Sequence, residues 1–170
     1  MKVKLLSVIL LLAFTSCVDS DPNVNTKGED IMDSLLVADN ATHQEYQDTV
    51  YVPIYSDIYS ESRQKSILLT ATLSIRSTSL VDTTYINFID YYDTQGNKIR
   101  SYVDDALMLK PMASLDYVID REDATGGTGA NFLVGWSAKK DTRPLIEAVM
   151  ISTSGQHGLS FITKGMSLKQ

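Results

Sequence analysis

The amino-acid sequence predicts an all-β protein, an antiparallel β-sandwich of about eight strands. From Thr49 onward the chain consists of short runs rich in Val, Ile, Thr, Tyr and Phe, the residues that favour strands. Turn-forming residues separate these runs at roughly hairpin spacing, and no long stretch has a helical period. A succession of short strands without helices is typical of a sandwich. At 170 residues the chain has room for one domain.

The eight predicted strands are residues 49–55, 66–77, 84–92, 97–103, 114–120, 130–138, 145–152 and 159–165. In the second, apolar residues alternate with polar ones from Leu69 to Ile75, so one face of this strand should lie in the core. Gly96 and Asn97 can take positive φ in a hairpin loop after the third strand. Pro111 predicts a turn, and Trp136 is expected in the core.

Residues 1–16 have the layout of a secretory signal peptide, with Lys2 and Lys4 ahead of a short apolar run. The run ends in "AFTSC", which resembles the lipobox of bacterial lipoproteins. On that resemblance Cys17 carries lipid and becomes the mature N-terminus. The alternative is an ordinary signal peptide cleaved near a cysteine. Cys17 is the chain's one cysteine, and a free thiol is unusual in an exported protein.

Residues 17–47 are predicted to form a flexible acidic tether and residues 48–170 the β-sandwich domain. The tether is polar and lacks a sustained apolar period. We expect an exported protein held in the bacterial cell envelope by lipid, either at the periplasmic face of the outer membrane or at the cell surface. Neither the leaflet, the oligomeric state nor ordering of the tether on binding follows from the sequence.

Charge and cysteine content limit the partners. With one cysteine no intrachain disulfide can form, so stability must come from the hydrophobic core. The formal charge is −6 and becomes −8 once Lys2 and Lys4 leave with the signal peptide. Such a chain repels phosphate backbones, which excludes nucleic acid. The expected partners are the membrane, through lipid on Cys17, and an envelope protein or a glycan.

The stretch "REDATGGTGANFLVGW" contains a glycine-rich loop at Gly126, Gly127 and Gly129. A phosphate-binding loop would need a lysine and a following helix, whereas this loop has no lysine and leads into a strand pattern. It is therefore interpreted as a turn that needs positive φ or a close backbone approach, and not as a nucleotide site.

Two titratable residues fall in the strand region. Glu147 lies in the apolar run "PLIEAVMIS", and if buried it needs a partner such as Arg121 or Arg143. His157 lies between glycines in "SGQHGLSF" and is most simply a loop residue. Neither belongs to a metal-ligand or nucleophile pattern, so no catalytic residue, metal or cofactor is expected.

The residues most suited to binding lie in two loops that precede strands. The first supplies Thr125, Gly126, Gly127, Gly129 and Asn131, and the second supplies Gln156 and His157. If the two following strands are parallel neighbours, the loops meet at one end of the sandwich. The alternative to a binding module is a metal-dependent or carboxylate/histidine hydrolase using Glu147 and His157, which requires both in one concavity. A third reading is a purely structural protein without a ligand.

The motifs "VYVPIYSDIY", "YYDTQGNKIRSYVD", "TGGTGANFLVGW" and "PLIEAVMISTSGQHGLSFITKG" resemble a family of small exported bacterial proteins known as a domain of unknown function. The resemblance runs from about Val50 to Gly165. It implies an exported β domain and no activity. The strand pattern is also similar, in architecture alone, to immunoglobulin-like sandwiches of envelope accessory proteins, a likeness that carries no function.

Overall fold

A computed structural model describes residues 44–154 and 157–168. The predicted signal peptide, Cys17, most of the predicted tether and Gln156 lie outside the described residues. The strands are β1 (Tyr46–Pro53), β2 (Asp57–Ser62), β3 (Lys65–Leu68), β4 (Thr70–Arg76), β5 (Thr84–Tyr92), β6 (Lys98–Ser101), β7 (Leu107–Leu109), β8 (Ser114–Ile119), β9 (Asn131–Ala138), β10 (Leu145–Ser154), β11 (His157–Lys164) and β12 (Met166–Ser167). One 3₁₀ turn, η2 (Gly127–Gly129), precedes β9.

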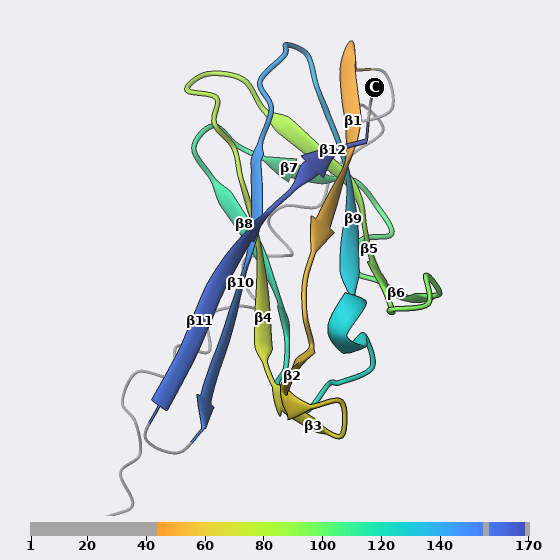
Figure 1. Ribbon diagram of the computed structural model, residues 1–170. Helices are drawn as coiled ribbons and strands as arrows, with labels where there is room; N and C mark the ends of the chain where they lie inside the picture. The colour runs from red at the N-terminus through yellow and green to blue at the C-terminus, as the bar shows by residue number, and fades with distance from the viewer. Residues whose placement is uncertain (1–43, 155–156, 169–170) are drawn as a thin grey trace, which may run out of the picture.

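The strands form two packed antiparallel sheets, which confirms the all-β sandwich (Figure 1). The first sheet has the order β12-β1-β9-β5-β6, with β7 also paired to β5, and the second has the order β11-β10-β4-β8. A separate hairpin joins β2 to β3. The eight predicted strands are all present. The count rises to twelve because the second predicted strand breaks at Leu69 into β3 and β4, and because β2, β7 and β12 were not predicted.

The core lies between the sheets and is built by strand alternation. Leu69, Ala71, Leu73 and Ile75 are fully buried, as predicted, and Trp136 is 3% exposed. These four residues belong to the same core cluster as Phe132 and Trp136, which lie on β9 of the first sheet. Because alternate residues on each strand point to opposite faces, burying one face of each sheet defines which residues remain outside.

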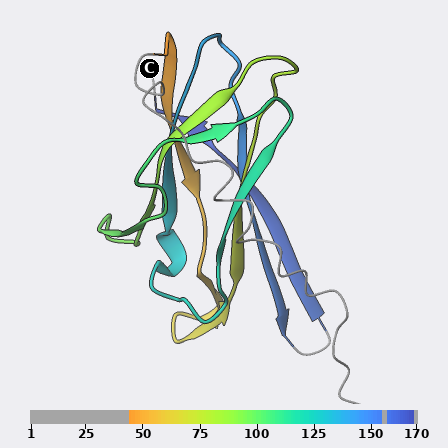
Figure 2. The same cartoon turned by 180° about the vertical axis from the view of Figure 1, so that it is seen from behind.

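The register gives the sandwich two distinct ends. Tyr46 pairs with Ala138, and Pro53 pairs with Asn131. The beginning of β1 and the end of the described chain lie together at one end, which we call the terminal end. The turn η2, the β2–β3 hairpin and the far end of the β10–β11 hairpin lie at the other, which we call the glycine-loop end. Figures 1 and 2 show β10–β11 diverging from the rest of the sandwich there.

The last crossing of the chain joins the two sheets. After β11 the chain passes at Gly165 from the second sheet to the first, where β12 pairs with β1. The Gly165 amide donates to the Ile146 carbonyl at 2.8 Å. A Cβ at Gly165 would lie 2.5 Å from Cγ1 of Val50, so only glycine allows the chain to pass this closely.

Replacing Leu73 with Ala should lower the free energy of unfolding by about 2–5 kcal/mol, since the side chain is fully buried and its removal leaves a cavity. Chemical denaturation measures the change. Thr72→Ala is the matched control on the opposite face of β4 and should cost less than about 1 kcal/mol. Equal losses for the two variants would contradict the assignment of the faces.

Candidate functional site

The glycine-rich loop is tied down by Thr94 and Ser56. The Gly126 carbonyl accepts hydrogen bonds from the Thr94 amide at 3.0 Å and from the Thr94 hydroxyl at 2.9 Å. The Gly129 amide donates to the same hydroxyl at 2.9 Å, and the Ser56 amide donates to the Gly127 carbonyl at 3.1 Å. These bonds join the loop to the β5–β6 turn and to the β1–β2 connection. Several of the loop's backbone amides and carbonyls are therefore already engaged in hydrogen bonds that stabilise the fold.

Two of the glycines have identifiable physical reasons. Gly126 sits over the buried hydroxyl of Tyr91, which shares a 2.7 Å hydrogen bond with the Ser56 hydroxyl. A Cβ at Gly126 would lie 2.0 Å from that Tyr91 oxygen. Gly127 has φ +71°, a backbone conformation that residues other than glycine rarely adopt. The sequence predicted a positive φ or a close approach in this loop, and the structure has one of each, at Gly127 and Gly126.

An ion pair holds the chain just before these glycines. The Arg100 guanidinium bonds the Asp123 carboxylate and lies 5.6 Å from the Tyr91 ring centre and 5.9 Å from that of Tyr102, within cation–π range. Burial alone would raise the pKa of Asp123. Hydrogen bonds from Thr125 and the pairing with Arg100 outweigh it, so the pKa lies below its usual value.

The described residues of the two predicted binding loops lie at the same end of the sandwich but belong to different sheets. Thr125 donates to Asp123, and Asn131 opens β9 opposite Pro53. His157 opens β11, where it pairs with Ser154. The strands β9 and β11 both begin at the glycine-loop end. They belong to separate sheets, so the stated condition of parallel neighbours is not met.

Glu147 and His157 lie at opposite ends of the β10–β11 hairpin. Glu147 pairs with Lys164, seven positions along β11 from His157, a separation of about 23 Å at 3.3 Å per residue. The Glu147 side chain is 16% exposed, and its carboxylate lies 3.8 Å from the guanidinium of Arg76. Its ion-pair partner is thus Arg76, and the suggestion of Arg121 or Arg143 was wrong. The geometry does not bring Glu147 and His157 into one site.

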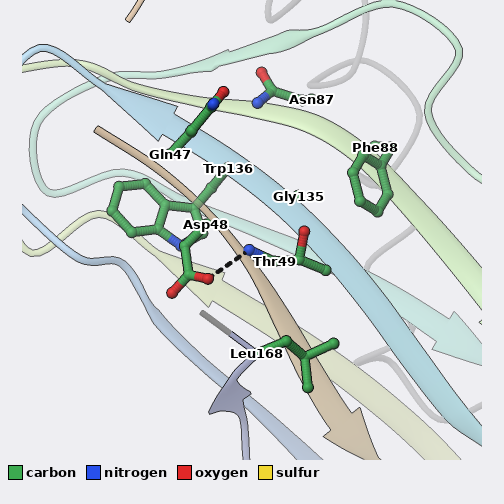
Figure 3. Close-up of a pocket in the computed structure, with 8 residues that line it drawn as sticks. All are labelled: Gln47, Asp48, Thr49, Asn87, Phe88, Gly135, Trp136 and Leu168. Atoms are coloured by element: carbon green, nitrogen blue, oxygen red, sulfur yellow. Dashed lines mark hydrogen bonds between the residues drawn. The ribbon is translucent and has the colours of Figure 1, made fainter. Parts of the chain in front are cut away.

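An open groove of about 510 Å³ lies on the first sheet (Figure 3). The lining residues are Gln47, Asp48, Thr49, Asn87, Phe88, Gly135, Trp136 and Leu168. We call it the Gly135 groove. Sequence reasoning missed it, because its residues come from β1, β5, β9 and the segment after β12.

Gly135 and a strand irregularity shape this groove. The register of β5 against β9 shifts between Ile86 and Phe88, and Asn87 accepts a hydrogen bond from the Ser137 hydroxyl at 3.1 Å. The Phe88 ring lies directly on Gly135, where an added Cβ would be 2.1 Å from its Cε1 atom. The Asp48 carboxylate accepts from the Thr49 amide at 2.7 Å. The groove thus combines an aromatic ring with carboxylate and amide side chains.

Residues 44–154 and 157–168 contain no group of three or more His, Cys, Asp or Glu side chains placed to hold a metal ion. Within the same residues no helix has the length and apolar character needed to cross a membrane.

Comparisons with known proteins identify a family and no activity. Residues 47–168 match the family described as "Protein of unknown function (DUF3124)". No curated protein matches the chain. A structure titled "Crystal Structure of Thermotoga maritima 1070" is similar over 70% of this chain and 92% of that one, with 12% sequence identity and a TM-score of 0.40. The family match covers nearly all of the described domain.

Gly126→Ala should destabilise the protein by more than about 1 kcal/mol, because the new methyl group would overlap the Tyr91 hydroxyl. Thermal and chemical unfolding measure the loss. Gly158→Ala is the control, since the nearest atom to its Cβ is 4.0 Å away. Part of the Gly126→Ala loss should be relieved in a Tyr91→Phe background. Equal effects at Gly126 and Gly158 would show that the close approach does not exist.

Acid should weaken the Arg100–Asp123 clamp. The folded-state pKa of Asp123 is lowered, so its contribution is present above the unfolded value of about 4 and is lost as the pH falls through the folded value. The free energy of unfolding of Asp123→Asn, measured between pH 2 and 6, should therefore fall less steeply with acid than that of the wild type. The exposed Asp105→Asn variant is the control. A slope unchanged by Asp123→Asn would refute the clamp.

Proposed function

The chain belongs to the DUF3124 family, and we propose that this member is a lipid-anchored protein of the bacterial cell envelope that acts as a non-catalytic binding module. The Gly135 groove is the observation that carries the binding role. Its volume of about 510 Å³ falls within the usual range of small-ligand sites. A purely structural spacer has no need of such a recess.

The groove suits a glycan fragment. The Phe88 ring offers a surface on which the apolar face of a sugar ring can pack. Gln47, Asp48 and Asn87 supply carboxylate and amide atoms able to exchange hydrogen bonds with hydroxyl groups. Leu168 adds an apolar wall. A mono- or oligosaccharide presents this combination of an apolar ring face and a polar edge.

The anchoring part of the proposal rests on the sequence. Cys17 follows an apolar run in a lipobox-like context, and two or more acyl chains give stable membrane attachment. The first described residues lie at the terminal end of the sandwich. The proposed tether is therefore attached at this end.

The geometry favours binding over hydrolysis. Glu147 and His157 lie about 23 Å apart along the β10–β11 hairpin, and Glu147 is placed beside Arg76 and opposite Lys164. A hydrolytic site needs its acid and base within reach of one bond. Glu147 does not line the Gly135 groove.

A thermal-shift screen of the purified chain against mono- and oligosaccharides, peptidoglycan fragments, nucleotides and divalent metals tests the proposal. A sugar present at a hundred times its dissociation constant should add about 2.7 kcal/mol, a shift of several degrees. Thr49→Tyr should abolish the shift, because Thr49 lines the groove and a larger side chain would fill it.

Thr72→Tyr, on the outer face of the other sheet, is the matched control and should leave the sugar response intact. A sugar shift that survives Thr49→Tyr would place the ligand elsewhere. No response to any sugar in the panel would contradict the glycan, and a response to metal alone, lost in Glu147→Gln, would favour the hydrolase.

A further inference from the structure

Strand β11 forms an open edge of the second sheet. The order β11-β10-β4-β8 leaves β11 with a neighbour on one side within the described part of the chain. An edge strand presents unpaired backbone donors and acceptors that can pair with another chain. Eight residues long, β11 is a substantial edge.

The other edges are shorter or carry charge. Strand β8 at the opposite edge has the exposed carboxylates Asp116 and, just after it, Asp120. In the first sheet, β12 has two residues and β6 has four. Charges and short length are the usual protections against edge pairing.

Strand β11 lacks these protections over most of its length. From Gly158 to Thr163 it has no charged residue and no proline. Ile162 is 60% exposed and Leu159 is 36% exposed. Beyond Ile162 the chain turns toward β1, since the Thr163 hydroxyl donates to the Pro53 carbonyl. The open stretch therefore ends at about Ile162.

We propose that this edge pairs with the same edge of a second copy of the chain, antiparallel, about a two-fold axis at Ser160. In this register Ser160 faces Ser160 of the second copy, Leu159 faces Phe161, and Gly158 faces Ile162. The two four-stranded sheets become one eight-stranded sheet. This inference is independent of the ligand in the Gly135 groove.

The strand is complementary to itself in this register. Two-fold pairing requires one patch to match its own rotated image. The Leu159–Phe161 pair brings two apolar side chains together, and the exposed Ile162 side chain covers a glycine. Cross-strand apolar pairs of this kind stabilise sheets. No charged side chain within Gly158–Ile162 meets a like charge, because the stretch has none.

The outer face of the sheet gives a second reason for a second copy. The register aligns Val118 with Thr72, Thr72 with Val149, and Val149 with Ile162, a row that crosses all four strands. Val118 is 47% exposed and Ile162 60%. Ile162 lies at the proposed junction, where it faces Gly158 of the second copy, so pairing brings the second copy's backbone beside the most exposed member of this row.

Antiparallel pairing turns the two copies end for end, and the N-terminal segment can accommodate this. Residues 18–43 separate Cys17 from the first described residue, and a fully extended chain of that length spans at most about 90 Å. An eight-residue strand is about 26 Å long. Both copies can therefore attach to one membrane.

Cysteine cross-linking of the full chain in intact cells tests the pairing. Ser160→Cys should give an oxidant-induced, reducible product of twice the chain mass, since directly opposed residues lie within disulfide range. Ser114→Cys, an exposed serine at the β8 edge, is the matched control and should stay monomeric. The wild-type chain controls for Cys17. Adding Ile162→Lys to Ser160→Cys should lower the dimer yield at least several-fold, with the unfolding temperature preserved.

Each other outcome would overturn the proposal. The first is an equal dimer yield from Ser160→Cys and Ser114→Cys. The second is a Ser160→Cys thiol that reacts with maleimide but gives no dimer. The third is a dimer yield that Ile162→Lys leaves unchanged. A cross-linked product of a different mass would replace the second copy with another envelope protein at this edge.

Discussion

The burial of one face of each sheet against the other is the constraint on which the rest of the structure depends. With a single cysteine in the chain, no intrachain disulfide contributes to the fold. Apolar contact in the core must therefore supply most of what holds the sheets together, and Leu73, Ile75 and Phe132 are accordingly fully buried. Because strand alternation fixes both faces at once, the same constraint leaves Val118, Ile151 and Ile162 exposed on the outside.

Much of the fold could be predicted because most of the strands are regular. The alternation in β4 and the Val-, Ile- and Tyr-rich runs of β5 and β9 identify strands without tertiary information. Strand β2 was missed because "DIYSES" is mostly polar and exposed, so it has no apolar period. Strands β7 and β12 are too short to show a period. The break at Leu69 could not be predicted, because the Leu69 amide donates a hydrogen bond to the carbonyl of Ser56, thirteen residues earlier.

The candidate site could be predicted only in part, and for a related reason. The sequence identified a loop that needed glycine, but the partners that make glycine necessary, Tyr91 and Thr94, come from a different hairpin. The Gly135 groove had no local signal at all, since Gly135 and Phe88 are 47 positions apart in the chain and meet only through the register of β5 and β9. The groove residues can be identified only once the pairing of β5 with β9 is known, because no sequence motif connects them.

The long ladder between β1 and β9 determines how the protein responds to mechanical load. The two strands are paired from Tyr46–Ala138 to Pro53–Asn131, and β1 enters the sandwich at the terminal end. A pull applied at the N-terminus, with the glycine-loop end held, acts along the strand axis. The ladder's hydrogen bonds then share the force in shear and do not break one at a time, as they would if β1 were peeled from the sheet. The first strand is thus a strong point of attachment for a domain pulled by its N-terminus.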